Sequence, residues 1–182
     1  MRPADTALLV VDVQQRLIAV LPEGERIVWN IARLLDGAQT LGVRFAATEQ
    51  VPDKLSPTVP QLAERLSEAA ATKSAFSCGE CGALFAAWQT AGIFRVLVCG
   101  IETHVCVQQT VLDLLAAGYQ VQIAVDAVGT RHTLDHQTAL RRMEASGALL
   151  TTTEAALFEW CGRAGTPEFK QISALVKQSP PS

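Results

Sequence analysis

Three side chains, Cys106, Asp12 and Lys73, have the types and positions that covalent catalysis requires. Cys106 follows an apolar run, residues 96–99, and a polar turn, and it precedes apolar positions that recur at helical spacing. This pattern predicts a strand, a tight turn and a helix, with Cys106 in the first helical turn at the carboxyl end of a central strand. Open α/β sheets bind ligands at that edge, and a helix N-terminus favours thiolate over thiol. The alternative for Cys106 is a small buried hydrophobic residue.

Asp12 and Lys73 supply the groups that would make such a thiol useful. Asp12 ends a run rich in leucine and β-branched residues, 6–13, which is typical of a central strand. Right-handed crossovers place this strand near the one before Cys106, so both side chains would face one crevice. Lys73 is the only cation in the irregular segment 72–78, and an ammonium beside the thiol is expected to lower its pKa from about 8.5. Taken alone, Asp12 could be a loop or cap residue and Lys73 a solvated surface residue.

Strands and helices alternate along the chain around these residues. We predict strands at residues 6–13, 43–48, 96–99, 121–125 and 148–151. Helices are predicted at 27–38 (ended by Gly42), 80–91, 103–115, 135–146 and 153–161, with a last helix that begins at Thr166. Segments 17–25, 49–60 and 72–78 are expected to be irregular, and 61–66 to form one or two helical turns. The pattern predicts a doubly wound, three-layer α/β/α domain, Rossmann-like, with a mostly parallel sheet of five to six strands. Residues 1–177 would form one domain and 178–182 a disordered tail.

Composition limits the classes of function. The chain has 182 residues, of which 49% are hydrophobic and 18% charged, enough to bury a sizeable core. Its net charge of −3 and the lack of a Lys/Arg run argue against a nucleic-acid partner. No apolar segment reaches the roughly 18 residues needed to span a bilayer. Five cysteines without a small-scaffold spacing, and an N-terminus without a signal-peptide layout, predict a soluble cytoplasmic protein with free thiols.

Two further motifs could bind metal or carry out redox chemistry. Cys78 and Cys81 form a C-x-x-C, but it follows an irregular segment, and no second C-x-x-C completes a zinc site. His132 and His136 are spaced i, i+4 and could chelate a metal if both lay on one helix, although no third ligand lies nearby in sequence.

Other catalytic classes are disfavoured by what the sequence lacks. It has no dinucleotide-binding glycine motif, phosphate-binding loop, serine-hydrolase elbow or H-E-x-x-H. A cysteine phosphatase would need an arginine six residues after Cys106, where Leu112 stands. A metal-assisted phosphotransferase would need a second aspartate where Gln14 stands.

Several stretches together carry a family resemblance: VVDVQ, TEQ, KSAFSC, GIETHVCVQQTVLDLLAAGYQV, ALRRM, TTTEAALFE and PEFKQIS. They resemble the isochorismatase-like cysteine hydrolases, most closely the isochorismatase domain-containing branch, over nearly the whole chain. The glycine-to-cysteine segment is the most specific of these stretches.

The resemblance implies a catalytic triad of Asp12, Lys73 and Cys106. It also implies a cis peptide bond between Ile101 and Glu102, which would turn the Glu102 N–H toward the Cys106 N–H to form an oxyanion hole. The nicotinamidase branch of the family binds a metal through an aspartate and two histidines after the second strand. The corresponding loop here, 49–60, has no histidine, so we expect a metal-free pocket and no cofactor.

The predicted function is hydrolysis of a small amide or related acyl compound through a covalent thioester. Isochorismate itself is not the expected substrate, because the vinyl-ether hydrolases of that name do not depend on a cysteine. Gln14, Glu49 and Phe76 are predicted to bind the substrate. The alternative is a non-catalytic scaffold or interaction protein that retains an oxidisable Cys106, and redox work by the C-x-x-C comes third. The resemblance and the apolar face of the last helix predict a homo-oligomer, a dimer or larger.

Overall fold

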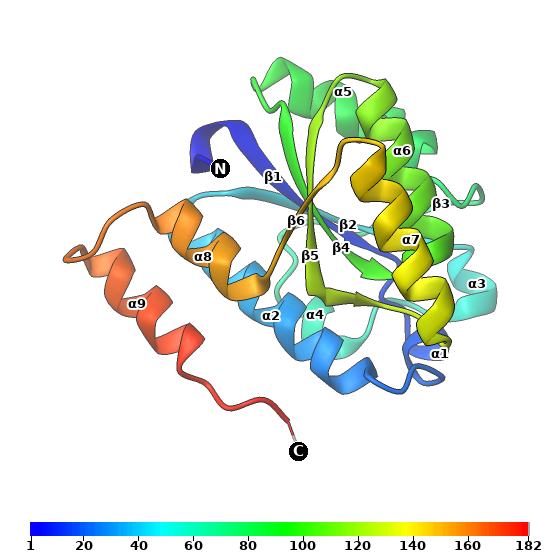
Figure 1. Ribbon diagram of the computed structural model, residues 1–182, viewed down its shortest axis with the longest axis horizontal. Helices are drawn as coiled ribbons and strands as arrows, with labels where there is room; N and C mark the ends of the chain where they lie inside the picture. The colour runs from blue at the N-terminus through cyan, green and yellow to red at the C-terminus, as the bar shows by residue number, and fades with distance from the viewer. Residues whose placement is uncertain (182) are drawn as a thin grey trace.

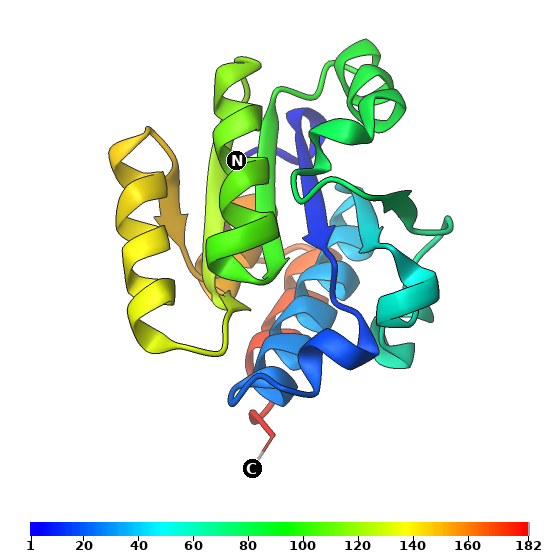
Figure 2. The same cartoon turned by 90° about the vertical axis from the view of Figure 1, so that its right-hand side faces the viewer.

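A parallel sheet forms the middle layer of the molecule. In this computed structural model, which describes residues 1–181, six strands run in the order β3-β2-β1-β4-β5-β6 and every neighbouring pair is parallel. The strands are β1 (Thr6–Val11), β2 (Arg44–Gln50), β3 (Ala71–Lys73), β4 (Arg95–Ile101), β5 (Gln120–Gly129) and β6 (Leu149–Thr151). This order reverses between β1 and β4, and Figure 2 shows their arrows ending at the same edge. Such a switch point is where doubly wound sheets bind ligands, and the predicted fold class is confirmed.

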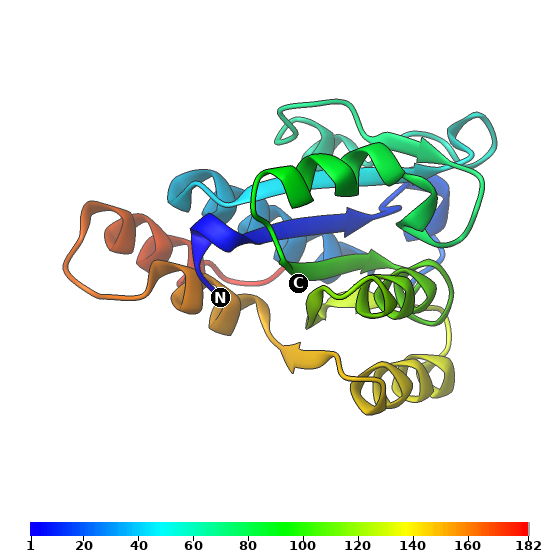
Figure 3. The same ribbon diagram turned by 90° about the horizontal axis from the view of Figure 1, so that it is seen from above.

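Helices cover both faces of the sheet, as Figure 1 shows from one side and Figure 3 from above. One layer contains α2 (Gly24–Leu41), α8 (Thr153–Cys161) and α9 (Pro167–Val176), and the other contains α5 (Gly82–Thr90), α6 (Gln108–Ala116) and α7 (Thr133–Ala145). Alternate residues of β1 point to opposite faces, so Leu8 packs in one core and Leu9 in the other. Within residues 1–181, no helix has the length and apolar character needed to cross a membrane.

The apolar face of the last helix packs on the body of the protein. Ile172 is fully buried, and Leu175 and Val176 pack against the same core as α2. The stripe therefore packs, at least in part, on the body of the protein. Residues 178–181 form neither helix nor strand, and the final residue of the predicted tail, 182, lies outside the described residues.

Sequence reasoning missed β3, whose last two residues fall in the segment 72–78 that is predicted to be irregular. The strand has three residues and no alternating apolar pattern, so it carries no local signal. It forms because its backbone pairs with the free edge of β2, where Gln50 lies opposite Lys73. This pairing places Lys73 at the carboxyl end of the sheet.

Three other expectations about the elements were wrong. The loop 49–60 contains the short helix α3 (Pro52–Leu55) and leads into α4 (Pro60–Ala63), and each begins with a proline, which the first turn of a helix tolerates. A further short helix, α1 (Gln15–Ile18), follows the first strand. Asp126 does not close its strand, because a register shift opposite residues 98–100 of β4 lets β5 continue to Gly129.

Gly100 allows β1 and β4 to approach closely just before the turn that carries Cys106. Its φ of +115° lies in the region that favours glycine, and a Cβ placed there would lie 2.1 Å from the carbonyl oxygen of Val11. Backbone, rather than a movable side chain, would have to shift to accommodate any other residue.

Gly100→Ala is therefore expected to lower the free energy of unfolding by about 3 to 5 kcal/mol. The matched control is Gly118→Ala, because Gly118 has a φ of +87° but no atom lies within 4 Å of the position that its Cβ would take. That variant should lose only the conformational cost, about 1 to 2 kcal/mol. Urea denaturation of both variants provides the comparison, and equal losses would show that the contact with Val11 is unimportant.

Candidate active site

Asp12 lies one residue beyond β1, at the edge where β1 and β4 end. Its φ of +51° is in the left-handed region, a strained conformation that often occurs at functional sites. Its backbone N–H donates to the carbonyl oxygen of Thr48 at 3.2 Å, and the residue is fully buried. A buried carboxylate needs charged or hydrogen-bonding partners, and it has both.

Lys73 forms an ion pair with Asp12 in which neither side chain is exposed to solvent. Nζ donates to Asp12 Oδ2 at 2.6 Å, to Gln50 Oε1 at 2.8 Å, and to the carbonyl oxygens of Phe76 and Ala75 at 2.9 and 3.2 Å. An ammonium has three hydrogens, so these four acceptors use its full donor capacity. Lys73 is therefore a buried partner of Asp12 rather than a solvated surface residue, and its effect on Cys106 acts through space.

Cys106 lies in a π-helical turn, Thr103–Val107, that leads into α6. The sequence predicted an ordinary α-helical turn here; the Val107 N–H instead donates to the carbonyl oxygen of Glu102, five residues back, at 3.3 Å. Single π turns are rare and are frequent at functional sites. Cys106 is 6% exposed, which leaves only a small opening to its thiol.

The expectation of a lowered thiol pKa at Cys106 was wrong. Burial raises the pKa of the Cys106 thiol, and the charge of the Asp12 carboxylate raises it further. The charge of Lys73 lowers this pKa but does not outweigh these two influences. The spacing of residues predicted a cation and a helix terminus but not the depth of burial. Cys106 therefore rests as a thiol that faces a carboxylate base.

The peptide bond between Ile101 and Glu102 is cis. The Glu102 side chain turns away toward the segment after β5, where Oε1 accepts hydrogen bonds from the Thr130 hydroxyl and the Arg131 backbone N–H and pairs with the Arg131 guanidinium at 3.0 Å. Burial alone would raise the pKa of Glu102, but the bonds from Arg131 and Thr130 lower it. The Glu102 carboxylate thus joins the turn before Cys106 to the end of β5.

The three predicted substrate-binding residues differ in how free their side chains are. Gln14 is fully buried, and its amide donates to the carbonyl oxygens of Gln50 and Ser56 while accepting the Gln50 N–H. Glu49 accepts from the backbone and hydroxyl of Thr58 at 2.6 and 2.7 Å. Both residues brace the segment that follows β2, and a contact with substrate stays a prediction for each. The side chain of Phe76 is 53% exposed and makes no hydrogen bond.

Two further residues of the site lie on β2, and of these sequence reasoning missed Thr48. The Thr48 hydroxyl donates to Asp12 Oδ1 at 2.7 Å, and Gln50 accepts from Lys73. Positions 48 and 50 alternate along the strand and therefore share one face, so a pair of polar residues at a strand exit was a signal that could have identified them.

The remaining cysteines and histidines form no metal centre. All five cysteines are free; burial raises the pKa of Cys78 to about 11, and its Sγ lies 3.4 Å from the Thr48 hydroxyl oxygen. His132 precedes α7, and His136 Nδ1 is within hydrogen-bond distance of the Thr103 hydroxyl. Within residues 1–181, no three His, Cys, Asp or Glu side chains gather as metal ligands.

A groove of about 880 Å³ lies elsewhere on the described surface. It is lined mainly by the start of α2, the neighbouring short helices α1 and α4, and the C-terminal residues Ser179 and Pro181. Asp12, Lys73 and Cys106 are not among its lining residues. We therefore identify the candidate active site by its buried polar groups rather than by the size of a cavity.

Comparison with known proteins finds relatives over nearly the whole chain. The family model described as Isochorismatase domain matches residues 6–155. The chain is 39% identical to isochorismatase domain-containing protein 2 of Bos taurus, over 98% of this chain and 86% of that protein. It is 35% identical to isochorismatase domain-containing protein 1 of Salmo salar but spans only 63% of the length of that protein.

Solved structures show the same fold. MAR1 ribonuclease from Caenorhabditis elegans superposes with a TM-score of 0.91 at 35% identity, covering 100% of this chain and 94% of that one. The YcaC gene product from Escherichia coli, described as an octameric hydrolase of unknown specificity, has a TM-score of 0.87 at 22% identity, covering 96% and 89%.

Proposed function

Because the chain belongs to the isochorismatase domain family, within the isochorismatase-like hydrolase superfamily, we propose that it is a metal-free cysteine hydrolase of a small amide or related acyl compound. The observation that carries the proposal is the fully buried Asp12 carboxylate, which is paired with Lys73 and lies near enough to Cys106 for its charge to raise the pKa of the thiol. A base beside a nucleophile, itself held by a third group, is the arrangement that activated nucleophiles require.

The chemistry begins from a neutral thiol and an ionised carboxylate. Cys106 Sγ attacks the substrate carbonyl carbon while Asp12 takes the thiol proton, so a free thiolate need not accumulate. The backbone N–H groups of Glu102 and Cys106 are assigned to the resulting oxyanion. Asp12 then gives its proton to the departing nitrogen as the C–N bond breaks, which leaves a thioester on Cys106.

Water completes the cycle through the same groups. It attacks the thioester carbonyl while Asp12 takes a proton from it, and the acid product leaves as the C–S bond breaks and Sγ recovers that proton. Lys73 holds the Asp12 carboxylate in place throughout. The loop after β2 has no histidine, which supports a route without a metal.

The test is release of the amine product from a panel of small primary amides, carbamoyl compounds and hydroxamates. We expect turnover of at least one compound, with intact mass showing an acyl group on Cys106 during the reaction. If the Cys106→Ala variant still hydrolyses the substrate, Cys106 is not the nucleophile. Absence of both turnover and adduct across the panel would favour the non-catalytic scaffold.

The name of the nematode relative suggests a second class of substrate, RNA. Electrostatics favours the acyl substrate instead. The chain has a net charge of −3 and its site contains a carboxylate, and both would repel the negatively charged phosphodiesters of RNA. A single-stranded RNA in the same panel separates the two, and cleavage that survives Cys106→Ala but needs added metal would overturn the hydrolase proposal.

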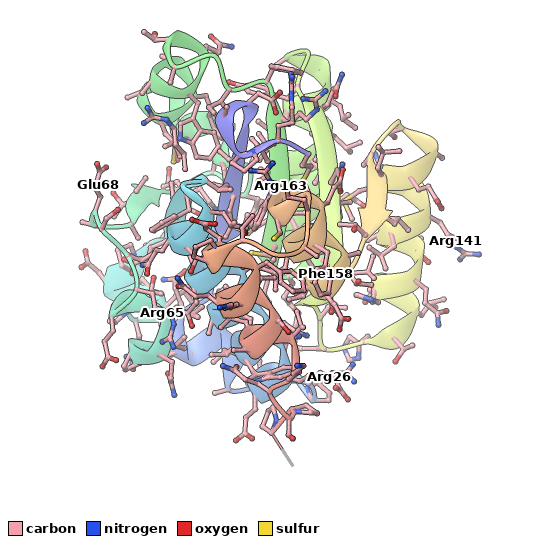
Figure 4. The ribbon with its side chains drawn as sticks, turned by 90° about the vertical axis from the view of Figure 1, so that its left-hand side faces the viewer. Arg26, Arg65, Glu68, Arg141, Phe158 and Arg163 are labelled. Carbon is pink, nitrogen blue, oxygen red and sulfur yellow. The ribbon has the colours of Figure 1, made fainter. Side chains whose placement is uncertain are left out.

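We also propose that the protein self-associates. The edge strand β6 exposes Leu149 and Leu150, 61% and 38%, and Phe158 is 39% exposed on α8, where Figure 4 labels it. The octameric YcaC protein supports this proposal at the level of the fold.

A further inference from the structure

Thr48 lies between the Asp12 carboxylate and the Cys78 thiol, and its hydroxyl contacts both. We propose that Thr48 is a positioning residue that fixes the orientation of the Asp12 carboxylate for proton exchange with Cys106, and that Cys78 supports Thr48 from behind. This inference rests on the proposed hydrolase function and extends it to β2 and to the first cysteine of the C-x-x-C.

The direction of each hydrogen bond follows from the chemistry of the groups. An ionised carboxylate only accepts, so the single hydroxyl hydrogen of Thr48 is donated to Asp12 Oδ1 at 2.7 Å. With that hydrogen committed, the Thr48 oxygen can only accept from Cys78, whose Sγ lies 3.4 Å away. The two hydrogen bonds therefore donate in one direction, from the Cys78 S–H to the Thr48 oxygen and from the Thr48 O–H to Asp12.

Thr48 gives the carboxylate a second fixed point. Lys73 holds Oδ2, and a carboxylate held through one oxygen could still rotate about its Cβ–Cγ bond. The Thr48 hydroxyl holds Oδ1, and the Asp12 backbone N–H donates to the Thr48 carbonyl oxygen, so residues 12 and 48 are joined by both main chain and side chain. With the plane fixed, the remaining lone pairs keep one direction for the thiol proton.

Cys78 links this pair to the helix that carries the nucleophile. Its backbone N–H donates at 2.9 Å to the hydroxyl of Thr110, which lies one helical turn after Cys106. Thr48, Cys78 and Thr110 are all fully buried, so these bonds have no competition from water. The first cysteine of the C-x-x-C is thereby given a structural task inside the site.

The experiment compares Thr48→Val with Thr48→Ser on the amide that the wild type hydrolyses. Valine keeps the shape and removes the donor, whereas serine keeps the donor. We expect Thr48→Val to lower kcat about 10- to 100-fold with little change in KM, and Thr48→Ser to stay within about threefold of wild type. Because the bond stabilises the ionised carboxylate, its loss should also move the acidic limb of the pH profile to higher pH.

The matched control is Thr153→Val, which removes the bond from the hydroxyl of another fully buried threonine to an aspartate, Asp126, at 3.0 Å and away from the site. It should lower the melting temperature without moving the pH profile. If Thr48→Val keeps the kcat and acidic limb of the wild type, or if Thr48→Ser falls as far as Thr48→Val, the positioning role is overturned while the hydrolase proposal stands.

A cycle in melting temperature tests the inference independently of turnover. Introduced into the wild type, Thr48→Val should lower the melting temperature more than it does when introduced into the Asp12→Asn variant. The Asp12→Asn variant already lacks the carboxylate to which the Thr48 hydroxyl donates. Equal losses in the two backgrounds would overturn the inference even if no amide is hydrolysed. Failure of the wild type to hydrolyse any compound would instead overturn the function on which the inference rests.

Discussion

Replacing Asp12 with asparagine is expected to abolish hydrolysis while making Cys106 easier to alkylate. The two effects separate because Asp12 has opposite influences on them. Its carboxylate raises the pKa of the Cys106 thiol, and without it the charge of Lys73 would favour the thiolate. Asparagine nearly matches the shape of aspartate and tolerates the left-handed φ of +51° at this position.

Turnover of the Asp12→Asn variant should fall by about 10³- to 10⁴-fold, because no base remains to move the proton. Its rate of alkylation by iodoacetamide at pH 7 should rise about tenfold for each unit by which the thiol pKa falls. Peptide mapping measures each thiol separately, and Cys161, which is partly exposed, serves as the internal standard. Slower labelling of Cys106 in the variant would mean that Asp12 assists alkylation as a base and that its charge is not the main influence on the thiol.

Replacing Lys73 with methionine is expected to cause the largest loss of stability in the site. Methionine fills much of the lysine stem but leaves the Asp12 carboxylate fully buried without its cation. Breaking a buried pair by removing one partner typically costs about 3 to 5 kcal/mol. Urea denaturation at pH 7 measures the loss, and hydrolysis should disappear with it.

The double variant Asp12→Asn/Lys73→Met tests whether this loss comes from the uncompensated charge. Removal of both charges should restore much of the free energy of unfolding without restoring hydrolysis. The carbonyl acceptors of Lys73 remain unsatisfied, so recovery should stop short of the wild type. A double variant less stable than Lys73→Met alone would show that the charge of Asp12 is not what destabilises the single variant.

Periodicity predicted the elements that carry Cys106 and Asp12, because both follow long strands with strong apolar patterns. The strand at residues 96–99, the turn and the helix after it appear as β4, the π turn and α6. The assignment of Lys73 depended on the family resemblance, since β3 has three residues and forms only by pairing with β2. Local patterns contain no information on such an edge strand.

The pKa of the Cys106 thiol was harder to predict from the sequence than the residues that form the site. A cation and a helix start near Cys106 suggested a lowered pKa, whereas burial and Asp12 raise it. Burial is the largest influence on this pKa, and the donors of Lys73 are committed to Asp12, Gln50 and backbone carbonyls. Sequence spacing shows which charges come near a thiol but not how deeply it is buried or how neighbouring donors are shared.

Because Lys73 lies on β3, the site can open with a smaller free energy than the fold as a whole. β3 is an edge strand paired at only three positions, while the two hydrophobic cores lie around β1, β4 and the large helices. Short edge segments open with a smaller free energy than the cores, as amide hydrogen exchange commonly shows. A brief detachment of β3 would carry the ammonium away from Asp12 and leave the rest of the sheet assembled. Inactivation on warming would then precede melting, and would reverse on cooling without any refolding of the cores.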